Sequence, residues 1–363
     1  MSRLRLLHLI HTPRHSGAEM IVYELCRLHS AWGHDCAVAS FSPPQPEFLR
    51  EVAELEMVGV SLFFPERTRV KLGRTLHYRN AVRRFQPDAV FGHSELPSLY
   101  GRFATGFGRD RILFSTVMHA ANNFSSPSFA MVERLTRLRV DDVIAVSEDA
   151  IQNYIRRFSE RVPVSVIQNG IDIDRFGKAD RQAARRNLGI DSRARLALQV
   201  GRICDTKRQL LSLSVMRSLL ATGEALLWFA GLAEDRAYKE RLRDMTVEWG
   251  IDRAVRFLGS RADVPDLLAA ADLYLMPSRQ EAHSVAILEA LVSGIPIVAS
   301  DIPAFSFARG MPSVRICGVE DEHAWRQAAR EMLAEPRATR DIGAFSIEST
   351  AQAYLNVAQR GRR

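Results

Sequence analysis

The sequence of 363 residues lacks the features that mark membrane-spanning and secreted proteins. It contains no apolar run approaching the roughly 20 residues that a membrane-spanning helix needs. The apolar segment at residues 4–10 is short for a signal peptide and ends in the polar pair His11 and Thr12. We therefore expect a cytoplasmic protein whose first strand lies in this segment.

Cysteine is scarce, and two familiar nucleotide-binding loops are missing. The four cysteines are scattered and form no Cys-x-x-Cys pair, which predicts free, mostly buried thiols. The chain contains neither Gly-x4-Gly-Lys-Ser/Thr nor Gly-x-Gly-x-x-Gly. Kinase and dehydrogenase activities therefore lose their main support.

Basic residues outnumber acidic ones, and the formal charge is +7. Residues 67–84 contain seven lysines and arginines and no acid. Such a segment can rest on anionic lipid, bind a phosphorylated acceptor or form an ordinary solvated helix face, and we favour the solvated face. No recognised nucleic-acid motif accompanies the charge, so we expect no nucleic-acid partner.

Apolar runs of strand length alternate with amphipathic stretches of helix length, and the alternation starts twice. The predicted strands are residues 5–11, 36–41, 60–64, 89–92, 112–117, 143–146 and 164–167, then 196–200, 226–230, 255–258, 273–276 and 295–298. This α/β pattern predicts two Rossmann-like, doubly wound parallel sheets facing across a cleft, with ligands at the carboxyl ends of the strands. We place the domains at residues 1–173 and 174–345, followed by a helix within 346–363.

The most informative stretch is residues 278–300, which lies between two predicted strands. Residues 285–292 are good helix formers, with Ser284 at the N-cap position and Gly294 where a left-handed cap belongs. The free N–H groups of Val285 and Ala286, together with the helix dipole, make a favourable seat for phosphate.

Two glutamates flank that phosphate seat. Glu281 lies in the loop before the helix, and Glu289 lies roughly 7.5 Å along the helix from Ser284. A nucleotide-sugar has the matching order of groups, because its diphosphate stands between a sugar and a ribose that both carry hydroxyls. Two solvated acids are the alternative interpretation.

The stretch resembles the Glu-x7-Glu signature of the retaining, nucleotide-sugar-dependent glycosyltransferases of family 4, which have the GT-B fold. The resemblance implies that Glu281 binds hydroxyls of the donor sugar and that Glu289 binds the ribose. It also implies a C-terminal helix that packs on the N-terminal domain, and a reaction that needs no metal or other cofactor. By the same resemblance Asp172 and Asp174, although spaced like a metal-binding Asp-x-Asp motif, are not metal ligands.

Other segments match the same family. Gly201, Arg202 and Lys207 match its Gly-Arg-x4-Lys motif, in which two cations can clamp a diphosphate. Gly17 matches the second glycine of its Gly-Gly-x-Glu loop, while Ser16 replaces the first. His119, just after a predicted strand, matches a histidine beside the donor sugar.

The catalytic candidates are therefore His119, Glu281, Arg202 and Lys207, and the donor-binding candidates are Gly17, Gly201, Leu258, Ser260, His283, Ser284, Val285, Ala286 and Glu289. The same resemblance implies that the turn with Leu258 and Ser260 holds the base through backbone groups. His93, at another strand end, has a weaker claim and is placed toward the acceptor. Ser147 is predicted to cap the following helix rather than to bind ligand.

We predict retaining transfer of a hexosyl group from a nucleoside diphosphate sugar to an acceptor hydroxyl. UDP-sugars are favoured over GDP-mannose, and the acceptor is expected to be a carbohydrate or lipid-linked precursor of a cell-surface polysaccharide or glycolipid. Peripheral contact with the inner face of the cytoplasmic membrane is part of this expectation. A catalytically silent nucleotide-sugar-binding protein and a sugar phosphorylase, which would often use pyridoxal phosphate, are the alternatives.

Overall fold

A computed structural model describes residues 3–106, 112–120, 123–159 and 162–360. The chain forms two compact units. Unit 1 contains Met1–Gly170 and Phe345–Arg363, and unit 2 contains Ile171–Ala344. The first unit therefore ends at residue 170 rather than 173. Of the predicted C-terminal helix region, residues 361–363 lie outside the described residues.

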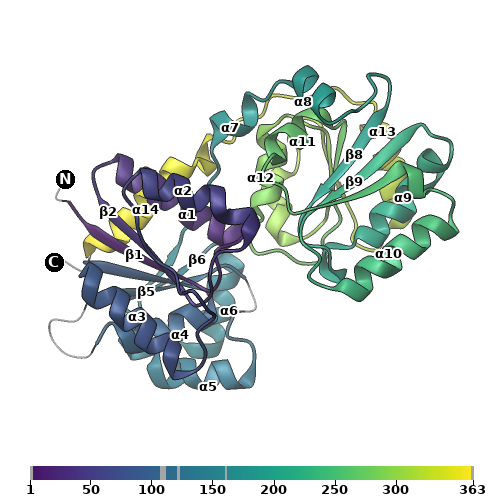
Figure 1. Ribbon diagram of the computed structural model, residues 1–363. Coiled ribbons are helices and arrows are strands. Elements are labelled where there is room, and N and C mark those ends of the chain that lie inside the picture. The colour runs from purple at the N-terminus through teal and green to yellow at the C-terminus, as the bar shows by residue number, and fades with distance from the viewer. Residues whose placement is uncertain (1–2, 107–111, 121–122, 160–161, 361–363) are drawn as a thin grey trace. The chain divides into compact units, whose positions relative to one another are not determined.

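Unit 1 is a parallel seven-stranded sheet in the order β3-β2-β1-β4-β5-β6-β7. Its strands are β1 (Arg5–Ile10), β2 (Asp35–Ser40), β3 (Ser61–Phe63), β4 (Ala89–His93), β5 (Leu113–Met118), β6 (Asp142–Ala145) and β7 (Val164–Val166). Its α-helices are α1 (Gly17–Ala31), α2 (Leu49–Met57), α3 (Leu72–Phe85), α4 (Glu95–Ala104), α5 (Pro127–Thr136), α6 (Glu148–Phe158) and α14 (Ile347–Arg360). Helices cover both faces of the sheet (Figure 1).

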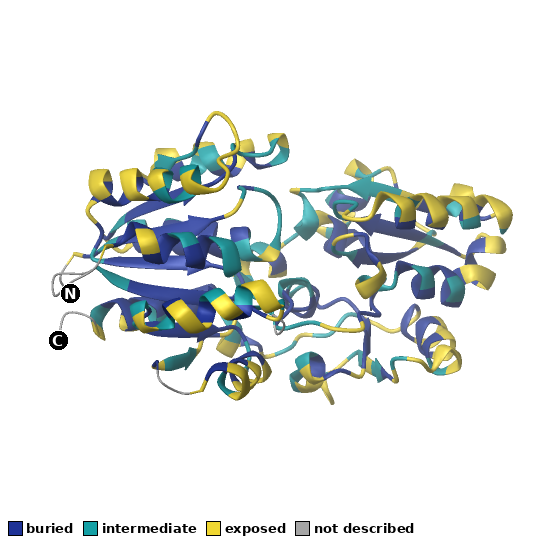
Figure 2. Cartoon of the chain, turned by 90° about the horizontal axis from the view of Figure 1, so that it is seen from below, coloured by how far each residue is buried: buried dark blue, intermediate teal, exposed yellow. Residues whose placement is uncertain are grey.

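The central strands of unit 1 are apolar on both faces because helices cover both. All five residues of β4 are buried, and so are the last five of β1. The buried strands lie between helices whose outer faces are exposed (Figure 2). The strand order reverses between β1 and β4, so the crevice at their carboxyl ends is a topological switch point, where ligands usually bind in such sheets.

The C-terminal helix α14 belongs to unit 1. The Thr350 hydroxyl donates a hydrogen bond to the carbonyl of Gln168 at 2.9 Å. A Cβ atom at Gly170 would lie 2.4 Å from the carbonyl oxygen of Ser346, so the chain before unit 2 touches the start of α14. A glycine is needed here because of this close approach.

Unit 2 is a parallel six-stranded sheet in the order β10-β9-β8-β11-β12-β13. Its strands are β8 (Arg195–Val200), β9 (Ala225–Ala230), β10 (Val255–Gly259), β11 (Leu273–Met276), β12 (Ile297–Ser300) and β13 (Val314–Cys317). Its α-helices are α7 (Ile173–Gly177), α8 (Arg181–Asn187), α9 (Gln209–Ala221), α10 (Arg236–Glu248), α11 (Val264–Ala270), α12 (Val285–Val292) and α13 (Glu322–Met332).

The two predicted Rossmann-like sheets are confirmed, with shifts at some strand ends. The strand predicted at residues 295–298 begins at Ile297, because Pro296 has no N–H and contributes its carbonyl to Tyr274 instead. Strand β13 was not predicted. It is an edge strand in which only Cys317 is buried, so it lacks the apolar run that marks the inner strands.

Candidate functional site

Three glycines end three neighbouring strands of unit 2. Two of them directly follow their strands, Gly201 after β8 and Gly231 after β9, and the third, Gly259, is the last residue of β10. Their φ angles are +149°, +148° and +72° respectively. A Cβ atom at Gly231 would lie 2.0 Å from the carbonyl oxygen of Gly201. The Gly231 N–H donates to the Gly259 carbonyl at 2.7 Å. The carboxyl edge of the sheet therefore presents backbone rather than side chains here, which favours close approach of a ligand.

Sequence analysis did not single out Gly231. Its signal was available, because Gly231 ends an apolar run in the same way that Gly201 does. A glycine at one strand end is weak evidence for a ligand site by itself. Two such glycines on adjacent strands indicate that the loops after these strands approach each other closely. Only the strand order shows that β8 and β9 are adjacent.

Lys207 and Glu281 meet at this edge. The ammonium of Lys207 forms an ion pair with the Glu281 carboxylate, and each side chain is 12% exposed. A short 3₁₀ turn, Asp205–Lys207, holds the lysine, and its carbonyl accepts a hydrogen bond from the Gln199 amide at 2.7 Å. A Cβ atom at Gly201 would touch the Lys207 side chain at 3.6 Å. Three predicted site residues thus come together.

Arg202 is placed differently from Lys207. Its guanidinium pairs with both carboxylate oxygens of Glu234, the longer distance being 2.6 Å. Both side chains of this pair are about half exposed, at 49% and 50%. Exposed pairs are weak, so an incoming anion can replace Glu234 at small cost.

Helix α12 begins at Val285, as predicted, and Gly294 follows it with φ +77°. Ser284 occupies the N-cap position, but its side chain makes no capping hydrogen bond. Beside it, the buried ring of His283 stacks on Phe307, with the ring centres 6.0 Å apart. Burial lowers the pKa of His283 to about 4, so this ring is neutral at pH 7.

Glu289 lies on α12 among surroundings that disfavour its charge. Burial raises its pKa to about 7, and the positive charge of Arg175 on α7 partly opposes the shift. Tyr274 in β11, which the sequence analysis missed, donates a hydrogen bond to the Val200 carbonyl at 3.3 Å. Burial, then the charges of Glu289 and Glu281, raise the pKa of Tyr274. Tyr274 therefore lies within the field of both glutamates, and a polar residue inside an apolar strand was the signal for it.

The base-binding candidates lie at the end of β10. Leu258 precedes the left-handed Gly259, and the pairing of β10 with β9 shifts register between Phe257 and Gly259. Ser260 follows directly. Strand β10 therefore departs from regular pairing with β9 at the residues that were predicted to bind the base of the nucleotide.

Gly17 and His119 belong to unit 1. Gly17 is the first residue of α1, after the N-cap residue Ser16, whose hydroxyl bonds to Glu19. His119 follows β5 and is hydrogen-bonded through Nε2 to Nδ1 of His93 at 2.9 Å. Ser147 caps α6 by accepting a hydrogen bond from the Ala150 N–H at 3.3 Å, which confirms its predicted structural role.

The two aspartates of the Asp-x-Asp triplet have structural contacts. Asp172 caps α7 by accepting a hydrogen bond from the Arg175 N–H at 3.0 Å, and Asp174 pairs with Lys178 at 2.9 Å. Across residues 3–360, apart from the undescribed gaps, no group of three or more His, Cys, Asp or Glu side chains is placed to hold a metal ion. Within the same described segments, no helix is long and apolar enough to span a membrane.

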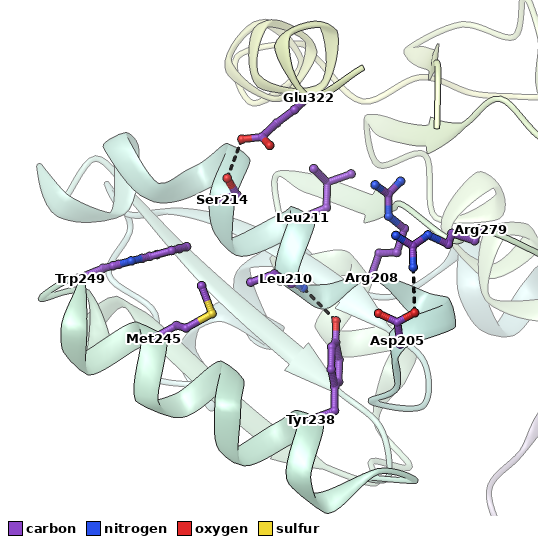
Figure 3. Close-up of a pocket in the computed structure, with 10 residues that line it drawn as sticks. All are labelled: Asp205, Arg208, Leu210, Leu211, Ser214, Tyr238, Met245, Trp249, Arg279 and Glu322. Carbon is purple, nitrogen blue, oxygen red and sulfur yellow. Dashed lines mark hydrogen bonds and ion pairs between the residues drawn. The ribbon is translucent and has the colours of Figure 1, made fainter. Parts of the chain in front are cut away.

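A pocket of about 320 Å³ opens between α9, α10 and α13 of unit 2 (Figure 3). Asp205 and Arg279 pair across part of its rim at 2.8 Å, and the Tyr238 hydroxyl accepts a hydrogen bond from the Leu210 N–H at 3.1 Å. The predicted site residues do not line it. Its charged groups already have partners within the chain, so it offers no built ligand site.

Comparison with known proteins shows that each of the two units matches a glycosyltransferase family model. Residues 15–175 match the family described as Glycosyltransferase Family 4, and residues 180–343 match the family described as Glycosyl transferases group 1. The chain is 31% identical over 149 residues to the lipopolysaccharide core biosynthesis mannosyltransferase LpsB of Rhizobium meliloti, covering 40% of this chain and 42% of that protein. It is 28% identical over 235 residues to the D-inositol 3-phosphate glycosyltransferase of Rhodococcus opacus, covering 59% and 52%. The chain thus spans about half the length of these curated relatives.

Solved structures share the fold over nearly the whole chain. A glycosyltransferase from Rickettsia africae superposes with a TM-score of 0.78 at 15% identity and covers 100% of both chains. The HepE protein of Anabaena, solved in complex with UDP and glucose, superposes with a TM-score of 0.76 at 19% identity and covers 99% of this chain and 98% of its own. The fold is therefore that of the GT-B proteins.

Proposed function

Because the chain belongs to the group 1 glycosyltransferases, with an N-terminal part of the family 4 type, we propose that it transfers a hexosyl group from a nucleoside diphosphate sugar to an acceptor hydroxyl. The observation that best supports this is the ion pair of Lys207 and Glu281 beside Gly201. A cation suited to a diphosphate and a carboxylate suited to sugar hydroxyls stand side by side. A nucleotide-sugar carries those two kinds of group next to each other.

The proposed roles follow the chemistry of each side chain. Lys207, Arg202 and the start of α12 stabilise the departing diphosphate, with His283, Ser284, Val285 and Ala286 forming that part of the site. Glu281 orients the donor sugar together with His119, and Glu289 accepts hydrogen bonds from the ribose. Gly17 and Gly201 allow close approach of backbone, and the strand end at Leu258 and Ser260 holds the base.

We propose retention of configuration by departure and attack on the same face. The bond between the anomeric carbon and the phosphate oxygen breaks, and the acceptor oxygen bonds to that carbon. The acceptor proton passes to an oxygen of the departing diphosphate, so no protein base is required. A double displacement would instead need two carboxylates about 5 Å apart across the bond. Glu281 is the one carboxylate assigned to the sugar, and Glu289 is assigned to the ribose, so this proposal contains no such pair. No metal ion or other cofactor is part of this proposal.

The proposed donor is a UDP-sugar, with GDP-mannose second. The bound UDP and glucose in HepE support the first, and the mannosyltransferase name of LpsB supports the second. The proposed acceptor is a carbohydrate or lipid-linked precursor of a cell-surface glycan, in line with the lipopolysaccharide role in the name of LpsB.

Contact with an anionic membrane is proposed through α3 and the segment before it. Leu72 and Leu76 on α3 are 69% and 57% exposed beside the exposed Arg79 and Arg83. Apolar side chains flanked by cations suit an anionic lipid surface. If the protein does not sediment with anionic vesicles at low salt, this part of the proposal is wrong.

Calorimetric titration with UDP, GDP, ADP and CMP, without metal, tests the donor site. We expect one diphosphate to bind best, and its binding to weaken in Glu289→Ala, which removes the proposed ribose contact. Turnover assays with the matching sugar nucleotides then identify the sugar. Binding of none of the four would contradict the proposed donor site, and binding without transfer or slow donor hydrolysis would indicate a silent binding protein.

A further inference from the structure

Three histidines of unit 1 form a continuous hydrogen-bonded chain. Nδ1 of His8 lies 2.9 Å from Nε2 of His93, and Nδ1 of His93 lies 2.9 Å from Nε2 of His119. His8 is in β1, His93 ends β4 and His119 follows β5, so the chain crosses three adjacent strands. It runs from the middle of the sheet to its carboxyl edge.

The inner end of this chain is closed. His8 is 0% exposed and His93 is 2% exposed. Nε2 of His8 is buried and has no hydrogen-bond partner among the residues that the structure describes. The Tyr354 ring of α14 packs against His93, and Phe91 stacks on His8. The chain therefore ends in packed apolar surroundings.

All three rings are neutral at pH 7. Burial lowers the pKa of His8 to about 3, the pKa of His119 to about 4 and the pKa of His93 well below its usual value. A neutral imidazole has one N–H donor and one acceptor nitrogen. Each of the two hydrogen bonds contains one proton. The nitrogen that bears the proton on one ring therefore determines which nitrogen bears it on the other two.

Only two proton arrangements satisfy both hydrogen bonds. In one, His8 donates to His93, and His93 donates to Nε2 of His119. In the other, the direction is reversed and His8 must bury an Nε2–H group without an acceptor. Orphaned buried N–H groups are rarer than under-satisfied acceptors, so the first arrangement is preferred.

We propose that His8 and His93 are positioning residues that hold His119 in the tautomer whose Nδ1–H donates a hydrogen bond to a hydroxyl of the donor sugar. In this tautomer Nε2 of His119 is occupied by His93 and Nδ1 already bears its proton. His119 is therefore a hydrogen-bond donor rather than a general base. The dead end at His8 equally excludes proton relay into the sheet, since His8 has no group to pass a proton to.

This inference rests on the proposed function only for the identity of the oxygen that His119 meets. The tautomer itself is measured without substrate, by long-range proton–nitrogen spectra of the full-length protein labelled with ¹⁵N-histidine, with signals assigned through single variants. We expect His119 to bear its proton on Nδ1 alone at pH 7.5. A proton on Nε2, a mixture of both forms or a doubly protonated ring would each overturn the inference.

The positioning role is tested by His93→Phe, which keeps a ring at this position and removes the N–H that points at His119. We expect the His119 signals to change to a mixture of tautomers, because Nε2 of His119 loses the donor that keeps it unprotonated. His77→Phe is the matched control, since His77 bonds to the Phe63 carbonyl and lies outside the chain of histidines. Unchanged His119 signals in His93→Phe would remove the two buried histidines from the mechanism.

Two replacements of His119 separate donation from bulk. Asparagine places an amide N–H near the position of Nδ1, whereas glutamine places it near Nε2. We expect His119→Asn to retain a kcat roughly three- to tenfold higher than His119→Gln, with the same nucleotide Kd in both. Equal kcat values would refute donation from Nδ1. Failure of the wild type to bind any nucleotide would refute the proposed function and leave the spectra valid.

Discussion

The ammonium of Lys207 and the carboxylate of Glu281, 74 positions apart in the chain, form an ion pair that is almost withdrawn from solvent. The Glu281 carboxylate offers Lys207 the negative charge that a diphosphate would supply in its place, and Lys207 neutralises a carboxylate that is proposed to bind sugar hydroxyls. We therefore expect binding of a donor to exchange this pair for contacts with diphosphate and sugar. The consequences differ for the two residues.

Glu281→Gln should lower turnover far more than nucleotide affinity. The carboxylate is proposed to contact only the sugar, and loss of a charged hydrogen bond costs roughly 10- to 100-fold in kcat. The Kd of the free diphosphate should stay constant or fall, because Lys207 is released from its partner. Steady-state kinetics and calorimetry measure the two quantities. Turnover close to wild type would show that Glu281 is misassigned.

Lys207→Met should lower the free energy of unfolding by about 1–3 kcal/mol, because it leaves the Glu281 carboxylate uncompensated. The double variant Lys207→Met with Glu281→Gln should recover part of this loss. Arg279→Met is the control, since its pair with Asp205 is 47% and 73% exposed and should contribute less than about 1 kcal/mol. Urea denaturation measures all three. A double variant no more stable than Lys207→Met would argue against the pair.

Nucleotide affinity should weaken as the pH falls from 8 to 6, because the ribose is proposed to bind ionised Glu289, whose pKa is about 7. The ionised fraction falls about tenfold over this range, which sets the upper limit of the effect on Kd. Glu289→Gln retains the titration of the nucleotide itself and lacks that of the carboxyl group. Calorimetry at both pH values compares them, and equal pH dependence would exclude Glu289 from the ribose contact.

The same raised pKa predicts a change in stability. A carboxyl whose pKa is higher in the folded than in the unfolded chain loses stabilising free energy as the pH rises through about 7. Glu289→Gln should therefore gain stability over wild type at pH 8 and show little gain near pH 4. Thermal unfolding at the two pH values measures it, and an equal difference at both would contradict the shift.

Gly231→Ala should destabilise unit 2 by several kcal/mol or prevent its folding, since the new Cβ would lie 2.0 Å from the Gly201 carbonyl oxygen. Gly223→Ala is the control. Gly223 also has a positive φ angle, +75°, but its Cβ would meet no atom within 4 Å, so only about 1 kcal/mol of backbone strain is expected. Comparable losses in the two variants would show that the contact at Gly231 relaxes easily.

The sequence alone was sufficient for features that depend on local patterns. The strands predicted at residues 89–92 and 273–276 are found because buried parallel strands are apolar on both faces and need no partner to be recognised. The helix after Ser284 follows from its good helix formers and from Gly294. The spacing of Glu281 and Glu289 is also visible in the sequence. It identified the segment whose Glu281 forms the ion pair with Lys207.

Tertiary structure alone decided which distant groups meet. Sequence motifs placed Arg202 and Lys207 together as one clamp, yet Arg202 pairs with Glu234 while Lys207 pairs with Glu281. The chain of His8, His93 and His119 was equally invisible, because β1, β4 and β5 become neighbours only through the strand order of the sheet. Hydrogen bonds and ion pairs act over a few ångströms. Their partners are therefore set by the packing of strands far apart in sequence, which local periodicity does not encode.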